Sequence, residues 1–249
     1  HSGVTNLNGG TVSIGAANNI GTGTLAFDGG TLNTTGTLTL ANAVTLGVGG
    51  GTVLTGADTT LSGVISGAGA LVKTGAANLT LSGANTYTGA TTVSAGTLTG
   101  TTTSLQGNIV NNADVVFDDA GVGTYAGNLT GTGTLTKLNT GSVTLSGVNT
   151  YSGATTVSGG TLIAAGTGIG DSSAVTVGAG ALLQLTGDET IGSLAGAGDV
   201  DTGAFTLTAG GNGTTTSHTG TLSGNALTKT GAGNFTLGGT GTLTGGIAA

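Results

Sequence analysis

Residues 67–98 read GAGALVKTGAANLTLSGANTYTGATTVSAGTL, and residues 131–162 read GTGTLTKLNTGSVTLSGVNTYSGATTVSGGTL. The second stretch repeats the first without a gap, 64 positions later. A third, partial copy spans residues 222–244. It contains Leu227-Thr228-Lys229-Thr230-Gly231, and it has Leu243 where the full copies have Tyr. Internal repetition of this kind is the sequence signature of repeat architectures.

A shorter period lies beneath the long one. The tripeptides Gly10-Thr11-Val12, Gly30-Thr31-Leu32 and Gly51-Thr52-Val53 follow one another at a nearly constant spacing. Three such intervals approximate the long repeat. The natural unit is therefore one solenoid coil of about 20–22 residues, and the chain holds about 12 coils. We expect residues 1–249 to form a single continuous β-solenoid.

The composition agrees with an all-β solenoid, a right-handed parallel β-helix. The 55 glycines suit chain corners, which need tight or left-handed turns. Between them, segments such as Leu79-Thr80-Leu81 and Val175-Thr176-Val177 alternate aliphatic and hydroxyl residues with strand periodicity. Helical spacing is absent, and the stretch Leu105–Asp119 also reads as strand. An antiparallel sandwich or a propeller fits the short period less well.

The full motif from Gly67 to Leu98, with Lys73, Asn85-Thr86-Tyr87 and Gly96-Thr97-Leu98, resembles the autotransporter-associated β-strand repeat. Residues 131–162 match the same pattern. The resemblance implies a right-handed parallel β-helix passenger that is secreted through an outer-membrane barrel and displayed at the bacterial cell surface. Residues 243–249 lack the amphipathic strands of such a barrel. Because such passengers differ in function, the resemblance predicts a scaffold and a location rather than an activity.

Charge limits the classes of partner. Ten acidic and three basic residues give a net charge of −7, which argues against nucleic acid as a partner. No apolar run is long enough to predict a transmembrane segment. The remaining partners are another protein or a cell-surface ligand. Self-association through the solenoid ends is a further hypothesis, because neither terminus carries an obvious cap.

Three groups of acids are candidates for polysaccharide chemistry: Asp118-Asp119, Asp188-Glu189, and Asp199 with Asp201. Adjacent residues of a strand point to opposite faces, so only the last group could converge on one face. The chain has almost no aromatic residues to stack on sugars. We therefore predict no catalytic residues and interpret these acids as solvated turn residues.

Metal and cofactor signals are weak. The segment Gly196–Asp201 faintly resembles the loops of calcium-binding β-rolls, which makes Asp199 and Asp201 the only metal candidates. No cofactor motif is present. His218 is a lone internal histidine without metal or catalytic partners in the sequence, and we interpret it as a surface turn residue.

Tyr87 and Tyr151 share one repeat position and are expected to cover corners of the solenoid. The only bases, Lys73, Lys137 and Lys229, also share one repeat position. Their side chains either donate hydrogen bonds to turn carbonyls or lie on a solvated face.

The leading hypothesis is an extracellular structural or adhesive rod without enzymatic activity, which in a sharper form assembles end to end into filaments. The alternatives are a β-helix polysaccharide lyase or hydrolase and a Thr-rich ice-binding solenoid. Segments such as Thr35-Gly36-Thr37 and Thr132-Gly133-Thr134 prompt the second alternative. Ice binding needs Thr rows in register on a flat face, and the irregular coil lengths argue against them.

Overall fold

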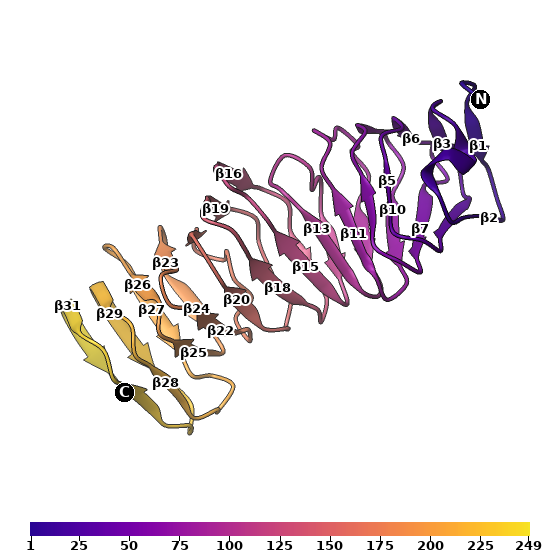
Figure 1. Cartoon of the computed structure of the whole chain (residues 1–249). Helices are drawn as coiled ribbons and strands as arrows, with labels where there is room; N and C mark the ends of the chain where they lie inside the picture. The colour runs from indigo at the N-terminus through magenta and orange to yellow at the C-terminus, as the bar shows by residue number, and fades with distance from the viewer. The chain divides into compact units, whose positions relative to one another are not determined.

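The computed structural model describes residues 1–249 and divides into two compact units, unit 1 (His1–Val116) and unit 2 (Phe117–Ala249). Within each unit, short parallel strands stack coil upon coil (Figure 1). The expected all-β solenoid of about 12 turns is confirmed. One 3₁₀ helix, η1 (Ala17–Ile20), is the only helical element. The expectation of one continuous domain over residues 1–249 stays a prediction.

The strands of unit 1 belong to three parallel sheets. The first sheet contains β1 (Thr5–Leu7), β3 (Leu25–Phe27), β6 (Val44–Leu46) and β9 (Ile65–Gly67). The second contains β2 (Thr11–Ile14), β4 (Thr31–Thr34), β7 (Gly51–Thr55), β10 (Leu71–Thr74), β12 (Thr91–Val93) and β14 (Ile109–Asn111). The third contains β5 (Leu38–Leu40), β8 (Thr59–Leu61), β11 (Asn78–Leu81) and β13 (Thr97–Gly100). Strand β15 (Asp114–Phe117) contains the boundary between the units.

Unit 2 is built from two longer sheets and one short strand, β17 (Leu129–Thr130). One sheet contains β18 (Thr134–Lys137), β20 (Thr155–Val157), β22 (Ala174–Val177), β25 (Ser193–Gly196), β28 (Thr216–His218) and β30 (Phe235–Leu237). The other contains β16 (Val122–Tyr125), β19 (Ser142–Leu145), β21 (Thr161–Ala164), β23 (Leu182–Leu185), β24 (Glu189–Ile191), β26 (Asp199–Asp201), β27 (Thr206–Ala209), β29 (Leu222–Lys229) and β31 (Gly241–Ala248).

The register of paired strands gives the coil length directly. Leu71 pairs with Thr91, and Thr155 pairs with Val175, in each case one coil further on. Most coils stay close to this length. The pairing of β23 with β26 spans a shorter coil (Leu182 with Asp199), and the pairing of β26 with β29 spans a longer one (Val200 with Leu222). The corners absorb these differences, so strand positions remain aligned.

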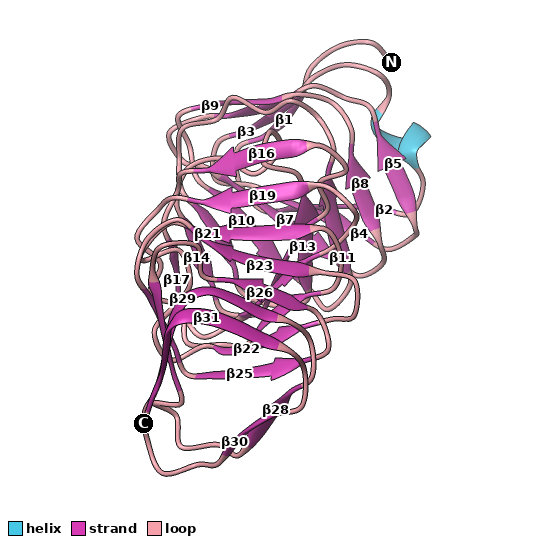
Figure 2. Ribbon diagram, turned by 90° about the vertical axis from the view of Figure 1, so that its left-hand side faces the viewer, coloured by secondary structure: helices cyan, strands magenta, loops and turns pink.

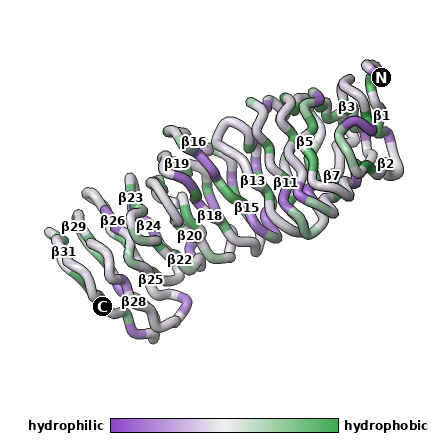
Figure 3. Tube along the Cα trace, viewed as in Figure 1, coloured by the Kyte–Doolittle hydropathy of each residue, from purple (hydrophilic) through white to green (hydrophobic).

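Alternation along each strand builds an aliphatic core. In β11, Leu79 and Leu81 are buried, whereas Asn78 and Thr80 face outward. Leu79 lies beside Leu98 of the next coil, so inward side chains form continuous columns. Burial of one such leucine contributes about 2 kcal/mol. Figure 3 shows hydrophobic residues along the strands and few strongly hydrophilic ones. The small cross-section explains why a chain with so few aromatics can fold.

Glycine is required where corners of successive coils touch. A Cβ at Gly69 would lie 1.8 Å from the carbonyl oxygen of Gly47, one coil earlier. Gly67 adopts a φ of 108°, which side chains other than hydrogen disfavour. The stacked loops at these corners are visible beside the strands in Figure 2.

Candidate functional site

Exposed aspartates act as corner caps in both units. Each accepts a backbone N–H from the following coil through Oδ1: Asp28 from Gly49 at 2.7 Å, Asp58 from Asn78 at 3.0 Å, Asp188 from Thr206 at 2.8 Å and Asp199 from Thr221 at 2.9 Å. A carboxylate that accepts such a bond satisfies a donor that the corner leaves unpaired. The acids therefore serve the backbone rather than converging on one site.

The Asp188-Glu189 pair is split between solvent and core. Asp188 is exposed, but Glu189 is only 2% exposed, so the interpretation of Glu189 as a solvated turn acid is wrong. Glu189 begins β24, and strand alternation turns it inward together with Ile191. Its Oε2 accepts the Gly168 N–H at 3.0 Å, whereas Oε1 has no hydrogen-bond partner.

Burial dominates the chemistry of Glu189. It raises the pKa of the carboxyl group from 4.5 to about 8, and nearby Asp171 adds to this shift. The peptide N–H groups of Ile169, Gly168 and Thr190 oppose it only in part. Glu189 is therefore mostly neutral at pH 7. The sequence signal for its burial was the alternation of Glu189 with Ile191.

Asp199 and Asp201 do share the outward face of β26, as the sequence indicated. Each carboxylate already holds a backbone group: Asp199 holds the Thr221 N–H, and Asp201 accepts the Gly203 N–H at 2.9 Å. No group of three or more His, Asp or Glu side chains is arranged to hold a metal ion. The prediction of no metal site, with this pair as a weak calcium candidate, stays a prediction.

His218 lies in the core, so its interpretation as a surface turn residue is wrong. It ends β28, paired with Gly196 on one side and Leu237 on the other. Neither ring nitrogen has a hydrogen-bond partner. Burial lowers the pKa of the imidazole below 6.5. The backbone at Thr221, the Asp199 carboxylate and the backbone at Ala195 oppose this shift only in part. The alternation Thr216-Ser217-His218 was the available signal for an inward ring.

The repeated lysines donate to turn carbonyls, which confirms the first of the two expected roles. Lys73 Nζ contacts the carbonyl oxygens of Thr74 at 3.2 Å, Gly75 at 2.7 Å and Ala95 at 2.8 Å. Lys137 Nζ repeats this pattern with Leu138 at 2.6 Å, Asn139 at 3.0 Å and Gly159 at 3.3 Å. In both cases the third carbonyl belongs to the next coil.

Both of these ammonium groups are fully buried. Burial lowers the pKa of Lys73 from 10.5 to about 8, and it also lowers the pKa of Lys137. The negative charges of Asp119 and Asp118 oppose the shift at Lys137. This places the Asp118-Asp119 pair beside a structural cation. Asp119 is buried, so its interpretation as a solvated turn acid is wrong, whereas Asp118 is half-buried.

Inside the repeat, the asparagine bridges neighbouring coils and the tyrosine bonds to a threonine of its own coil. Asn85 Oδ1 accepts the Ile65 N–H at 2.8 Å from the previous coil, and its Nδ2 donates to the Ser104 carbonyl at 2.7 Å in the next. Tyr87 Oη lies 2.9 Å from Thr91 Oγ1. The second copy reproduces these contacts through Asn149 and Tyr151. Both tyrosines are buried rather than lying over corners.

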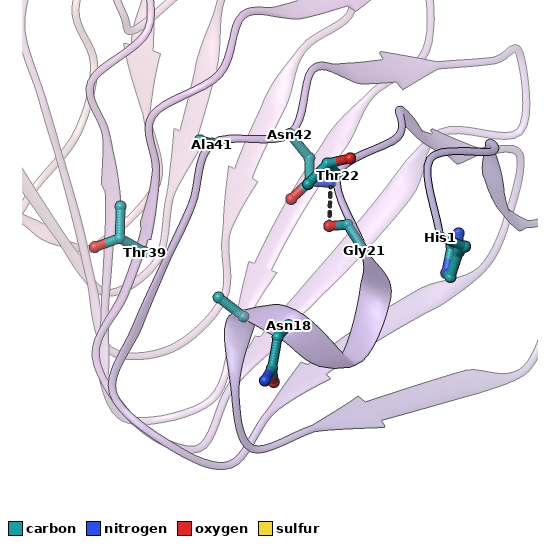
Figure 4. A pocket seen from close by; sticks show the side chains of 8 residues that line it. His1, Asn18, Gly21, Thr22, Thr39, Ala41 and Asn42 are labelled. Carbon is teal, nitrogen blue, oxygen red and sulfur yellow. Dashed lines mark hydrogen bonds between the residues drawn. The ribbon is translucent and has the colours of Figure 1, made fainter.

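A cavity with a volume of about 800 Å³ lies in unit 1 (Figure 4). It lies beside η1 and β5 and is lined by His1, Ala17, Asn18, Gly21, Thr22, Thr39, Ala41 and Asn42. Asn42 Nδ2 donates to the carbonyl oxygens of Gly21 at 3.1 Å and Gly23 at 2.6 Å. The walls are neutral apart from His1. The sequence signal for this cavity was the loss of alternation between Ile14 and Leu25.

A smaller cavity of about 330 Å³ lies in unit 2, lined by Val148, Asn149, Thr150, Thr167, Asp171 and Ser172. Glu189, whose raised pKa would suit a general acid, does not line it. Asp171 is the one acid in its lining, so neither of these two cavities presents a pair of acids to a substrate.

Outward threonines form rows in register despite the variable coil lengths. In unit 1, Thr39 pairs with Thr60, Thr60 with Thr80, and Thr80 with Thr99. The neighbouring outward positions are mixed, with Asn78 beside Thr97. Asn78 Nδ2 donates to Thr80 Oγ1 at 3.0 Å, so part of this face is bonded to itself.

Comparison with known proteins matches two segments of the chain to a repeat family. The model of the passenger-associated transport repeat matches residues 71–99 and 135–164, the segments that supply the buried Lys, Asn and Tyr. The resemblance to a repeat-bearing autotransporter passenger is thereby confirmed.

A relative gives a more particular likeness. The Adhesin BmaC autotransporter of Brucella suis biovar 1 (strain 1330) is 49% identical over 140 residues, which cover 53% of this chain. The chain spans only 4% of that relative's length. A search of the solved structures gives no match. No helix here has the length and apolar character needed to cross a bilayer.

Proposed function

We propose that this chain is an extracellular adhesive scaffold of a bacterial autotransporter-like surface protein, without enzymatic activity. The observation that carries the proposal is that the few charged side chains bind the protein's own backbone. The buried lysines and the capping aspartates hold backbone groups of adjacent coils, which leaves the outward strands to contact a partner. Passenger-type repeats and an adhesin relative support export and adhesion.

The outward faces favour contact by hydrogen bonding rather than by charge. Only 5% of residues are charged, and outward strand positions are mostly Thr, Ser and Asn. Electrostatic steering is therefore weak, and adhesion should depend little on ionic strength.

Beads coated with the purified chain provide the direct test, with albumin-coated beads as the control. We expect binding to cultured cells or to another protein-coated surface that soluble chain competes away and that persists at raised salt. Absence of any competable binding would contradict the adhesive function. Reproducible polysaccharide cleavage that disappears on replacing one acid would contradict the non-enzymatic role.

End-to-end assembly is a finer part of the proposal. Strand β31 pairs with β29 alone, and Leu237 and Ile247, which continue inward columns, are 37% and 53% exposed. Lys229 Nζ holds the carbonyls of Thr230 and Gly231 but no third carbonyl. Another solenoid coil stacked on this face would cover the apolar residues and complete the lysine contacts.

Light scattering and electron microscopy at increasing concentration test this assembly. We expect association that Ile247→Asp weakens, whereas Val48→Asp, a change at a 94% exposed valine of unit 1, leaves it intact. Monomers alone at high concentration would contradict assembly without affecting the adhesion result.

The in-register row from Thr39 to Thr99 supports ice binding as a second candidate, although its mixed neighbouring column gives a narrow array. A thermal-hysteresis assay that compares the Thr60→Val variant with the unchanged chain tests ice binding. Equal freezing behaviour of the chain and of albumin would exclude this candidate.

A further inference from the structure

The free edge of β5 in unit 1 lies against the cavity of about 800 Å³. Strand β5 has one partner, β8, and is the last strand of its sheet. In the coil before it, η1 stands between β2 and β3, where later coils of unit 1 place a strand of this sheet. Thr39 and Ala41 of this edge both line the cavity, and η1 residues form its other wall (Figure 4).

The direction of the β5 backbone groups follows from two hydrogen bonds. The Leu38 N–H donates to the Asp58 carbonyl at 3.1 Å, and the Leu40 carbonyl accepts from the Ser62 N–H at 2.8 Å, so both point toward β8. Every peptide bond is trans, and the C=O and N–H of a trans peptide point in opposite directions. The N–H of Ala41, which shares a peptide with the Leu40 carbonyl, therefore points away from β8.

The N–H and C=O of Thr39 also point away from β8, because successive residues of a parallel strand direct their hydrogen-bonding groups alternately to the strands on either side. These groups form a strand edge of the kind that pairs with an added strand. The cavity beside them is large enough for a ligand. Its walls are formed by small side chains, including those of Ala17, Thr22 and Asn42. No Asp, Glu or Lys side chain lines it.

We propose that this cavity is a docking site for an extended peptide strand of a partner protein, which pairs with the free edge of β5 beneath η1. Main-chain hydrogen bonds to Thr39 and Ala41 supply the attachment, as in other cases of strand addition. Uncharged side chains fit the walls, which are neutral apart from His1. The inference gives the adhesive function proposed above a partner class and a position, but peptide binding is measured without any adhesion assay.

The probe is the acetylated and amidated peptide Asn-Leu-Thr-Leu-Ser-Gly, the sequence of Asn78–Gly83, which forms a strand of this same sheet. Titration calorimetry measures its affinity for the whole chain. Amide hydrogen exchange locates it, and we expect new protection at Thr39 and Ala41.

Two proline variants remove one edge N–H each. Thr39→Pro and Ala41→Pro delete donors that point away from β8, a placement that edge strands tolerate. Loss of one hydrogen bond predicts binding weaker by about three- to tenfold. Thr39→Ala and Ala41→Ser keep the N–H groups and should bind within about twofold of the unchanged chain.

Ala41→Pro lies outside β5, so it remains informative if Thr39→Pro fails to fold. Peptide affinity unchanged in a folded Ala41→Pro variant, or protection elsewhere in the chain, would overturn the proposal. Saturable binding of a neutral hexasaccharide in this cavity without peptide binding would also overturn it. Failure of the bead assay with peptide binding retained would count against the adhesive function alone.

Discussion

Lys73 Nζ lies 2.8 Å from the carbonyl oxygen of Ala95, one coil further along the chain. The same relationship joins Lys137 to Gly159 in unit 2. A buried ammonium group is tolerated only where acceptors replace its hydration, and three carbonyl oxygens do so at each of these corners. The lysine of the repeat is therefore a clamp between coils.

Replacing Lys73 by Met should destabilise unit 1 by about 2–4 kcal/mol, because buried carbonyl groups lose their donor. Chemical denaturation followed by circular dichroism measures the change in free energy of unfolding. Faster amide exchange near Ala95 would show that the coil contact itself has opened.

Lys229→Met is the matched control, because Lys229 holds only two carbonyls and is only half-buried. We expect a loss below about 1.5 kcal/mol. A loss at Lys229 as large as that at Lys73 would show that the coil-to-coil contact is not what matters.

Asn85 should be as sensitive as the lysine. Asn85→Ala removes one bond to the coil before and one to the coil after, and it leaves the Ile65 N–H without a partner. We expect a loss of about 2–4 kcal/mol in thermal or chemical unfolding. The exposed neighbour Thr86 provides the control, and Thr86→Ala should stay within about 0.5 kcal/mol.

The solenoid could be predicted because the residues that form its corners and core recur with the coil period. Gly69 and Leu79 recur at coil spacing, and spacing alone sets which strands pair. The 3₁₀ helix was not predictable in the same way. Residues 15–24 lack both helical and strand periodicity. Ile20 is the one residue of η1 whose side chain is buried in the core.

The polar interior was harder to predict than the fold. Composition and charge suggest that Glu189 and His218 are solvated, since these residue types are seldom fully buried. Strand alternation decides otherwise, because a shift by one residue would expose Ile191. At such positions strand periodicity predicts burial better than residue type does. The cavity at β5 could not be predicted from periodicity, because most of its lining residues come from non-repeating segments.

Glu189 should make unit 2 less stable as the pH rises. Its folded pKa of about 8 exceeds the ordinary 4.5, so between these values folded unit 2 keeps a proton that the unfolded chain has released. The free energy of unfolding therefore falls with rising pH in this window, by on the order of a few kcal/mol in total. Denaturation at several pH values measures the slope.

Glu189→Gln keeps an acceptor for the Gly168 N–H and should remove the slope. Asp188→Asn changes the exposed neighbour and should leave it in place. A slope that persists in Glu189→Gln would assign the titration to another group.

His218 should give the opposite dependence. Its folded pKa lies below the ordinary 6.5, so as the pH falls below about 6.5 the unfolded chain binds a proton before folded unit 2 does. Stability is therefore lost on the acid side. We expect the protection factors of the amides in β28 and β30, corrected for the intrinsic pH dependence of exchange, to fall at pH 5, because His218 ends β28 and pairs with β30.

His218→Leu replaces an imidazole without hydrogen bonds by a side chain like those of the same inward column, where Val177 and Leu237 lie. It should abolish the acid sensitivity and raise stability at pH 5, since no proton can then be taken up at this position. Ser217→Ala, on the outward face of β28, should change neither. Acid sensitivity retained in His218→Leu would assign the titration to another group. If the acid sensitivity is lost and the Glu189 slope is kept, two buried groups limit the stability of unit 2, His218 at low pH and Glu189 at high pH.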